Sequence, residues 1–564
     1  MMLKLKSLFI ILNLFLLQLL SFAQDVNLKK EFVSPLKFET NLSGNFGEPR
    51  HRHFHSGIDF RTYQNGKEIV SVADGYVCRI SVSPWGYGLG LYIAHPNGYT
   101  SVYGHLNEFR KDIQNFVRKI QYENKSYSVD TLLNPDLFKV KKGELVAFSG
   151  NTGYSEGPHL HFEIRETKTE QPINVVNSVY DFKDNLPPEI SAIVFYPLSN
   201  NSFINGKAEK FFLKVVKRDG VYVCANDLPE VTGLIGLGVA YVDRMNETSN
   251  RYGAKTVSLF MDNELIFKSN LEKISFETQA SKNSMFDFEY LLKEKLHVHK
   301  LFVEAGNELM IYDKTINNGM FSLNEKSKAN FTVIITDYNN NSSELNFELI
   351  KDNKNYDLLE RDGYLVKYDS VFLYFDSEFR FETQIGSLFY DTNLKIEKGK
   401  KRKYSQSYII GEDHLAVNKD FKISFYINDE AYKYKDKLFI MREHNKKSNY
   451  LKPIIEQNFI SAYSSYFGEF YLWIDTTPPK IVPIRPKKTY TEENLNYLSF
   501  KITDDLSGIS SYAIYINNRW VLTQYEPKTK TIFYQKDEYF EKSNSYKIKV
   551  VVKDNCNNEA ILEL

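Results

Sequence analysis

Residues 153–163 read Gly-Tyr-Ser-Glu-Gly-Pro-His-Leu-His-Phe-Glu and place two histidines two positions apart. The glycines and the proline predict a turn, and the residues that follow predict a β-strand. Because side chains alternate between the two faces of a strand, His159 and His161 should point to the same side. Imidazoles held on a rigid element are suitable ligands for a divalent metal ion.

Two further motifs precede this strand. Residues 55–59 read His-Ser-Gly-Ile-Asp, and residues 103–106 read Tyr-Gly-His-Leu. The first supplies His55 and Asp59, and the second supplies His105. Together with the later pair, these imidazoles and this carboxylate have the donor chemistry of a zinc site.

In this order, the three motifs resemble the pattern of the lysostaphin-like zinc metallopeptidases, also called LytM-type, which cut peptidoglycan. The family pattern is His-x-x-x-Asp, then His-Leu after a Tyr-rich strand, then His-x-His, and all of it is present. The resemblance runs from about Phe46 to about Arg165. A lone His-x-His would carry little weight, whereas the ordered set is specific. Residues between the motifs also match: Gly66, Ala73–Val77, Gly86–Gly88, Lys142–Glu144 and Ser149–Gly153.

The resemblance implies a compact antiparallel β domain with the duplicated-hybrid-motif fold and one Zn²⁺ per chain. It implies that His55, Asp59 and His161 are the metal ligands, with an open position for water. His105 and His159 are then the catalytic candidates, as general base, oxyanion stabiliser or proton donor to the leaving amine. The division of these steps between them stays open. For each residue the competing interpretation is an ordinary strand, loop or packed side chain.

The other histidines have weaker claims to a functional role. His51 and His53 are expected to be solvated loop residues, and His95, in His-Pro-Asn-Gly, a turn residue. No carboxylate partner is evident for the remaining four, to which we assign no metal: His297, His299, His414 and His444.

Composition describes the chain as a whole. Its 564 residues are enough for three or four domains. Lys+Arg and Asp+Glu both number 71, so no basic field indicates nucleic acid as a partner. Aromatic residues make up 15%, which suits a mainly β chain. The spacing of Cys78, Cys224 and Cys556 excludes a cysteine zinc site and favours three buried thiols over a disulfide.

Residues 1–23 predict a signal peptide. Lys4 and Lys6 precede an apolar run from Leu8 to Leu20, and Ser21–Ala23 offer a small-x-small cleavage site. The apolar run is short for a membrane-spanning helix. We therefore expect export to the periplasm or cell envelope, with no membrane span after signal removal.

Proline-rich linkers divide the rest of the chain. Pro187-Pro188 and Pro478-Pro479 resist helix formation and strand pairing. Each is followed by a β-rich stretch with an Asp-Asn turn near its end, which predicts a diverged repeat of an immunoglobulin-like sandwich. The expected domains are the peptidase domain at 24–184, an immunoglobulin-like β domain at 187–350, a β-rich domain at 351–474 and a second immunoglobulin-like β domain at 477–564.

An insertion at 109–137 departs from the short members of the family. An amphipathic helix is predicted by five apolar residues at helical spacing: Phe109, Ile113, Phe116, Val117 and Ile120. Residues 122–129 predict a small hairpin. We expect the apolar face of the helix to pack on the β core and its polar face to lie along one wall of the cleft, where it shapes substrate access.

The favoured function is an exported zinc endopeptidase acting on peptidoglycan stem or cross-link peptides. One alternative is a non-catalytic wall-binding or hydrolase-activating module, which the intact set of five key residues disfavours. Another is an adhesion protein, although such β domains are more often spacers or targeting modules. The C-terminal β domains are the candidate surface for a cell-envelope protein partner. Because residues from Pro187 onward carry no catalytic motif, a chain ending near Asp184 is expected to fold alone.

Overall fold

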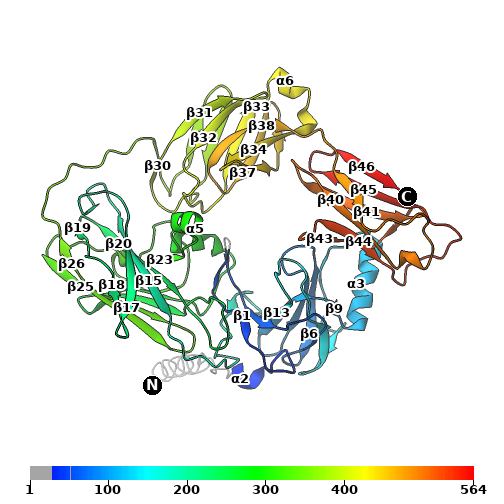
Figure 1. Cartoon of the computed structure of the whole chain (residues 1–564), viewed down its shortest axis with the longest axis horizontal. Coiled ribbons are helices and arrows are strands. Elements are labelled where there is room, and N and C mark those ends of the chain that lie inside the picture. The colour runs from blue at the N-terminus through cyan, green and yellow to red at the C-terminus, as the bar shows by residue number, and fades with distance from the viewer. Residues whose placement is uncertain (1–27, 51–52) are drawn as a thin grey trace, which may run out of the picture.

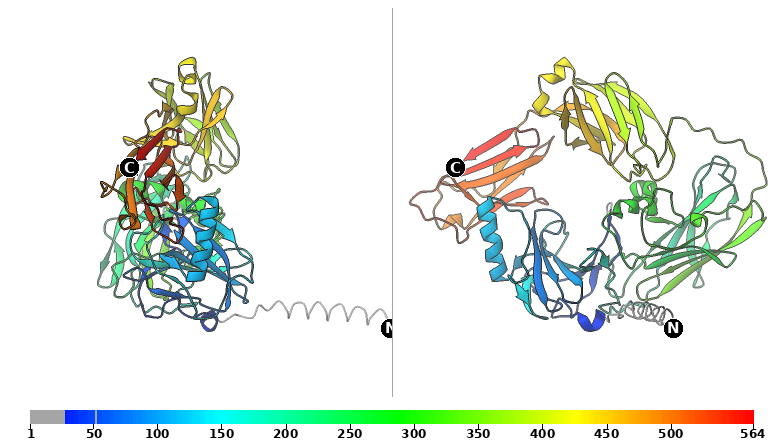
Figure 2. Two further views of the ribbon diagram at one scale, coloured as in Figure 1. Left: turned by 90° about the vertical axis from the view of Figure 1, so that its right-hand side faces the viewer. Right: turned by 180° about the vertical axis from the view of Figure 1, so that it is seen from behind.

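The computed structural model describes residues 28–50 and 53–564. The predicted signal peptide at 1–23 and His51 lie outside the described residues. Four β-rich domains follow one another around a ring (Figure 1). The C-terminal domain returns to the N-terminal domain beside helix α3 (Lys111–Asn124), as the view from behind also shows (Figure 2). None of the helices in the described ranges is long and apolar enough to cross a membrane.

A nine-stranded antiparallel sheet is the centre of the N-terminal domain, and β13 (His159–Glu166) lies inside it. β13 pairs with β4 (Ile58–Arg61) on one side and β8 (Tyr99–Leu106) on the other. The other strands are β1 (Leu42–Gly44) beyond β4, then β7 (Leu89–Ala94), β6 (Gly75–Val82) and β10 (Val129–Leu132) beyond β8, with β11 (Lys139–Val140) on β6 and β14 (Pro172–Ile173) on β13. Two small sheets join β5 (Glu68–Val70), β12 (Leu145–Phe148) and β9 (Glu108–Phe109), and β2 (Pro49–Arg50) with β3 (His53–Phe54).

Alternation along β13 separates core residues from polar residues. Leu160, Phe162 and Ile164 are fully buried in the hydrophobic core. The intervening positions therefore turn the polar side chains to the opposite face of the strand, and these are His159, His161, Glu163 and Arg165. The strand geometry therefore places His159 and His161 on one face, as predicted.

The insertion contains the predicted amphipathic helix. Ile113 and Val117 are buried, and Phe116 and Ile120 pack partly buried against the same core. The predicted hairpin at 122–129 does not form, because α3 continues to Asn124 and is capped by Lys125, which has a left-handed φ of 47°. The strand that follows, β10, pairs with β6 instead.

The remaining three domains are also built from strands, so the prediction of a mainly β chain is confirmed. In the second domain twelve strands follow one hydrogen-bonded network rather than two separate sheets. Its immunoglobulin-like character stays a prediction. The strands are β15 (Glu189–Pro197), β16 (Phe203–Ile204), β17 (Phe211–Arg218), β18 (Val221–Cys224), β19 (Glu230–Thr232), β20 (Ile235–Val242), β21 (Thr256–Met261), β22 (Glu264–Asn270), β23 (Val298–Lys300), β24 (Tyr312–Thr315), β25 (Lys328–Thr336) and β26 (Ser342–Lys351).

Each of the last two domains has a pair of sheets lining one hydrophobic core. In the third domain one sheet contains β28 (Phe372–Phe375), β29 (Phe379–Thr383), β33 (Phe421–Tyr426), β37 (Phe459–Ser464) and β36 (Ile454–Glu456). The other contains β31 (Ile396–Lys401), β32 (Gln406–Ile410), β38 (Gly468–Ile474), β34 (Leu438–His444) and β35 (Lys447–Leu451). A small two-stranded sheet of β27 (Tyr364–Val366) and β30 (Thr392–Leu394) accompanies them. In the fourth domain the two sheets are β39 (Lys480–Pro483), β40 (Tyr497–Thr503), β44 (Thr531–Gln535) and β43 (Gln524–Glu526), and β42 (Arg519–Val521), β41 (Ile509–Ile516), β45 (Ile548–Asp554) and β46 (Glu559–Glu563).

The core of the N-terminal domain continues into the second domain. The Tyr338 hydroxyl donates a hydrogen bond of 2.9 Å to the Phe46 carbonyl, and the Tyr252 hydroxyl donates one of 2.9 Å to the Leu42 carbonyl. Nine residues of the second domain belong to the same apolar cluster as the N-terminal sheet: Met245, Tyr252, Leu271, Ile274, Met285, Phe286, Leu309, Ile311 and Tyr338. The first two domains therefore form one packed unit.

A chain that ends at Asp184 should not fold cooperatively, in contrast to the expectation from sequence, because it leaves the apolar side of this interface exposed. A chain that ends after Tyr356 keeps both domains and should show one sharp thermal transition by circular dichroism. Comparing the two chains, each starting at Gln24, checks this. A sharp transition in the shorter chain would show that the second domain is dispensable for folding.

The polar face of α3 contacts the fourth domain. The Tyr122 ring stacks on Tyr539 with centroids 4.0 Å apart and meets Trp520 edge-on at 5.3 Å. The Tyr122 hydroxyl donates to the Asp537 carboxylate at 2.7 Å, and Arg118 pairs with the same carboxylate at 3.4 Å. These contacts close the ring, so this face of the helix binds another domain and does not simply line a cleft.

Tyr122→Ala should open the ring, because it removes two aromatic contacts and a hydrogen bond to a carboxylate. We expect a larger radius of gyration in small-angle scattering and faster proteolysis of the Thr476–Pro479 linker. Lys119→Ala, on an exposed position of the same helix, is the matched control. Identical scattering curves for wild type and Tyr122→Ala would show that the ring is held elsewhere.

Candidate metal centre

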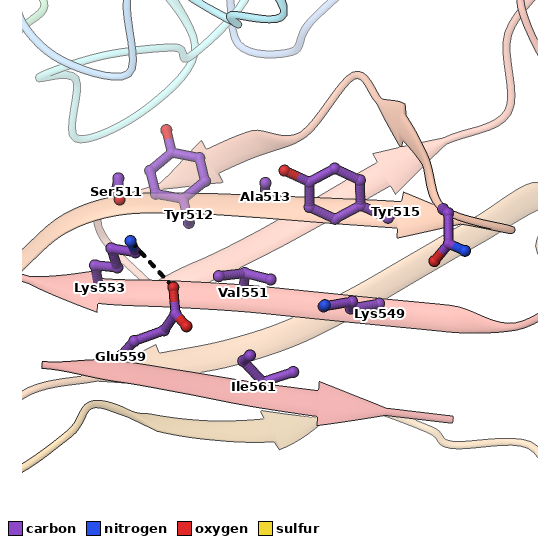
Figure 3. A pocket seen from close by; sticks show the side chains of 10 residues that line it. Ser511, Tyr512, Ala513, Tyr515, Lys549, Val551, Lys553, Glu559 and Ile561 are labelled. Carbon is purple, nitrogen blue, oxygen red and sulfur yellow. Dashed lines mark ion pairs between the residues drawn. The ribbon is translucent and has the colours of Figure 1, made fainter.

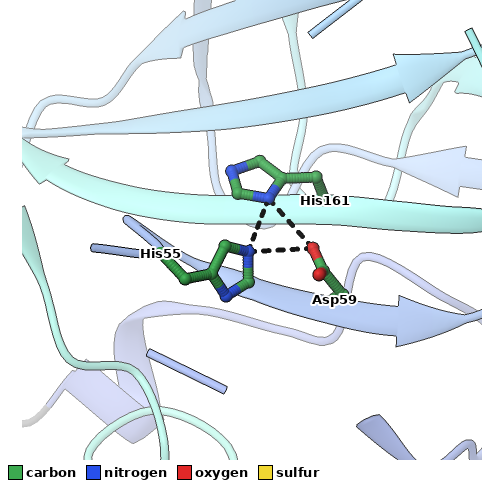
Figure 4. A group of neighbouring side chains, drawn as sticks. All are labelled: His55, Asp59 and His161. Carbon is green, nitrogen blue, oxygen red and sulfur yellow. Dashed lines mark hydrogen bonds and ion pairs between the residues drawn. The ribbon is translucent and has the colours of Figure 1, made fainter. Parts of the chain in front are cut away.

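His55, Asp59 and His161 converge on one point (Figure 4). Asp59 on β4 stands opposite His161 on β13 in the strand register, and His55 lies in the segment just before β4. His55 Nε2 is 3.0 Å from Asp59 Oδ1, His55 Nε2 is 3.0 Å from His161 Nδ1, and His161 Nδ1 is 3.0 Å from Asp59 Oδ1. Three donor atoms in such a triangle suit one shared ion at about 2 Å from each.

Hydrogen bonds behind the two histidines set the direction of their lone pairs. His55 Nδ1 donates to the Asn45 carbonyl at 2.6 Å, and His161 Nε2 donates to the Glu163 carboxylate at 2.7 Å. Both partners can only accept, so these nitrogens carry the protons. The other nitrogen of each ring faces Asp59. Converging lone pairs and a carboxylate fit a bound cation, and this nitrogen and oxygen donor set fits zinc.

The charges around His161 also favour a cation. Burial alone would lower the pKa of His161, but hydrogen bonds with Asp59 and Glu163 raise it to about 9. For Asp59, burial alone would raise the pKa, but the His55 and His161 imidazoles hold it well below its usual value. A proton and a metal ion therefore compete for His161 Nδ1, so metal binding should weaken as the pH falls.

Glu163 is a site residue that the motif comparison missed. It is fully buried and accepts hydrogen bonds from Arg165 Nε at 2.6 Å, Tyr87 at 2.5 Å and Ser56 at 2.7 Å. Burial would raise the pKa of Glu163, but Arg165 and His161 lower it. The carboxylate is thus kept ionised behind His161. The period-2 alternation of β13 could have found it, since it lies two positions beyond His161 on the same face.

The second domain orients His55 through Asn45. The Asn45 side chain donates to the Gly253 carbonyl at 2.9 Å and accepts from the Gly253 amide at 3.1 Å. The Asn45 carbonyl in turn accepts from His55. Because this clamp joins residues 208 positions apart in the chain, no local sequence pattern indicates it.

His105 and His159 lie beside the triangle, with ring centroids 4.7 Å apart. His105 Nδ1 donates to the Thr152 carbonyl at 2.8 Å, and His159 Nδ1 donates to the Gly157 carbonyl at 2.8 Å. Burial, followed by the charges of His161 and His159, lowers the pKa of His105 to about 3, and burial also lowers that of His159. Both rings are therefore neutral near pH 7 and keep Nε2 free to accept a proton.

The backbone at His105 is held in an unusual conformation. Its φ is 58°, in the left-handed region that is uncommon for residues other than glycine, although histidine adopts it more often than most. His159 Nε2 lies 3.5 Å from Asp59 Oδ1, at the edge of the triangle. Backbone strain of this kind persists where surrounding contacts over-determine the position, which is common at functional sites.

Two other sequence expectations concern His95 and the cysteines. His95 begins a turn, as expected, because the Gly98 amide donates to its carbonyl at 3.2 Å, and its side chain is buried with its two nitrogens bonded to the Asp74 carbonyl at 2.9 Å and the Ser101 hydroxyl at 2.8 Å. The three cysteines are free, but only Cys556 is fully buried, while Cys78 and Cys224 are half-buried.

A hollow on the fourth domain contains none of the predicted site residues. It lies across β41, β45 and β46 and is lined by Tyr512, Tyr515, Lys549 and an ion pair of 3.1 Å between Lys553 and Glu559 (Figure 3). The histidine cluster belongs to the N-terminal sheet and not to this surface.

Comparison with known proteins finds similarity in two parts of the chain. Residues 53–122 and 133–175 match the profile of peptidase family M23. Residues 363–475 match that of the Zu5-like domain and coincide with the two five-stranded sheets.

Three curated relatives align with the N-terminal part. An uncharacterised metalloprotease of Haemophilus influenzae is 33% identical over 148 residues, which is 25% of this chain and 26% of that protein. The DD-carboxypeptidase/endopeptidase Mpg of Neisseria meningitidis is 32% identical over 150 residues, covering 26% of this chain and 28% of Mpg. The peptidoglycan DD-endopeptidase ShyA of Vibrio cholerae is 28% identical over 160 residues, covering 27% of this chain and 31% of ShyA. The chain thus matches less than a third of the length of each relative.

Proposed function

We propose that the N-terminal domain, which matches the profile of peptidase family M23 over residues 53–122 and 133–175, is a zinc endopeptidase that hydrolyses peptide bonds in peptidoglycan. The observation that carries the proposal is the triangle of His55, Asp59 and His161, with 3.0 Å between its donor atoms. The names of Mpg and ShyA support the substrate class, because both are DD-endopeptidases and ShyA is named for peptidoglycan.

In this proposal His55 Nε2, Asp59 and His161 Nδ1 hold one Zn²⁺. A zinc ion supplies Lewis acidity and lowers the pKa of a water molecule to near neutrality. Asn45 and Glu163 hold the two imidazoles in the tautomers whose lone pairs would be available to the ion. Partners of this kind orient metal ligands and raise their basicity.

His105 and His159 then move protons. Each is neutral and carries a free Nε2, because its Nδ1 proton is held by a backbone carbonyl. Such a nitrogen can take the proton released by the attacking water and return it to the leaving amine. The protonated ring can also stabilise negative charge that develops on the substrate oxygen. We propose that the two histidines share these steps, and that the chain acts after export to the cell envelope.

The test is digestion of purified peptidoglycan by the full chain from Gln24, followed by mass analysis of the released fragments. We expect fragments with a new amino terminus within the stem or cross-link peptides, and none after the zinc has been removed by chelation. A zinc-loaded chain that binds peptidoglycan but releases nothing would favour a non-catalytic wall-binding module.

A further inference from the structure

A second group of carboxylates lies where the first two domains meet. Asp184, Asp243 and Asp337 each offer a carboxylate oxygen within 4.8 Å of the others. Asp184 belongs to the linker before β15, Asp243 follows β20, and Asp337 follows β25. The adjacent cation, Arg244, is directed elsewhere, to Glu189 at 3.7 Å and to the Ser249 carbonyl at 3.3 Å.

Asp243 has an unsatisfied carboxylate oxygen in this group. Its side chain is only 2% exposed, and Oδ1 has no hydrogen-bond partner among the described residues. Asp337, in contrast, accepts from the amides of Asn339 and Asn341 at 2.8 Å each. The Arg244 backbone amide bonds to this carboxylate, but an ionised, buried oxygen that is left without a donor is unfavourable, and two neighbouring carboxylates make it more so. When they are ionised, these three carboxylates therefore need a positive charge beside them.

We propose that Asp184, Asp243 and Asp337 bind one Ca²⁺ ion. An all-oxygen donor set suits a hard cation, whereas zinc prefers nitrogen and sulfur ligands. Calcium lies about 2.3 to 2.6 Å from its oxygen ligands, so two ligands of one ion are at most about 5 Å apart. The observed limit of 4.8 Å satisfies this condition. Magnesium fits less well because it requires near-ideal octahedral geometry and keeps most of its water.

In the absence of calcium, a proton on Asp243 reduces the negative charge of the three carboxylates. Burial, followed by the charges of Asp337 and Asp184, raises the pKa of Asp243 to about 8.

The fourth domain contains a matched group that serves as an internal control. Asp475, Asp504 and Asp554 also lie within 4.8 Å of one another, and they occupy the corresponding places in the linker, after β40 and at the end of β45. There Asp504 Oδ1 accepts from the amides of Leu506 at 3.1 Å and Gly508 at 2.6 Å. Because its carboxylate already has donors, we propose no ion for this group.

A bound ion would stabilise the interface between the first two domains. Asp337 precedes Tyr338, whose hydroxyl reaches the Phe46 carbonyl. The backbone of Asp243 pairs with that of Tyr252, at 3.3 Å and 3.0 Å, and the next residue, Gly253, clamps Asn45. The linker and two strand ends of the second domain would thus be tied together beside the clamp that orients His55.

The experiment uses the full chain from Gln24 with zinc in excess, titrated with CaCl₂ by calorimetry and followed by thermal unfolding. We expect binding with a Kd between about 10⁻⁶ and 10⁻³ M, a rise of several degrees in Tm, and a smaller rise with equal MgCl₂. Asp243→Asn should abolish the calcium effect, whereas Asp504→Asn should retain it.

The thermal-unfolding measurement also tests whether the variants fold. Without calcium the Asp243 carboxyl is protonated near pH 7, and Asp243→Asn replaces it with a neutral side chain of the same shape, so its Tm without calcium should be close to that of the wild type. If the wild type shows no heat and no Tm shift up to about 10 mM calcium, or if Asp243→Asn responds like the wild type, the proposal is wrong. Neither readout depends on peptide hydrolysis, so the result is independent of the proposed enzymatic activity.

Discussion

Replacing His161 with alanine should abolish metal binding and peptidoglycan hydrolysis together. His161 Nδ1 is one corner of a triangle whose other corners are a single nitrogen and a single carboxylate, and two ligands cannot hold a catalytic zinc. Metal analysis should show a decrease from one zinc per chain to almost none, and fragment release should fall to the level of the chelated wild type. Asp59→Asn should have the same effect, because it removes the negative charge of the site.

A graded variant separates ligand loss from loss of fold. Glu163→Gln keeps all three ligands but removes the charge behind His161, so the zinc affinity should weaken about 10-fold to 100-fold without disappearing. His444→Ala, in the third domain, is the histidine control and should behave as wild type. Stoichiometric zinc with unchanged affinity in His161→Ala would exclude this residue from the ligand set.

Substituting His105 or His159 should affect turnover and spare the metal. Neither ring contributes an atom to the triangle, and each keeps a free Nε2 beside it. His105→Ala and His159→Ala should therefore bind zinc normally, while kcat falls by about 10² to 10⁴, as is typical when an acid–base group is lost. The KM should change much less than kcat, because these rings act on protons rather than on substrate binding.

The pH dependence distinguishes proton transfer from a structural role. Removing a group that titrates in the enzyme–substrate complex should eliminate one limb of the pH profile of kcat. If a variant retains the shape of the profile and has only a lower Tm, its histidine is structural. Near wild-type rates in both variants would refute the catalytic role of this pair.

The fourth domain is close enough to the site to influence it. Lys528 donates to the Asn151 carbonyl at 2.7 Å, and Trp85 contacts both Tyr154 and Tyr525 with ring centroids 5.6 and 5.8 Å apart. The residue after Asn151 is Thr152, whose carbonyl orients His105. The effect of Tyr122→Ala on digestion, measured beside its effect on scattering, would show whether ring closure and catalysis are coupled.

The sequence by itself determined the elements that depend on local periodicity. Alternation along 159–166 places His159 and His161 on one face, and the spacing of Ile113 and Val117 places both on the buried side of a helix. The order of the three motifs was enough to nominate His55, Asp59, His105, His159 and His161. These features can be predicted from the sequence because the faces of a strand and of a helix repeat with fixed periods along the chain.

Only the tertiary structure decided how these elements are supported. Asn45 meets Gly253 across 208 positions and Tyr122 meets Asp537 across 415, and both contacts depend on how separate domains pack. The convergence of Asp184, Asp243 and Asp337 likewise requires a linker and two strand ends to meet at one joint. Single hydrogen bonds and carboxylate clusters between distant segments produce no periodic pattern in the sequence. They are defined by the relative positions of folded elements rather than by residue spacing.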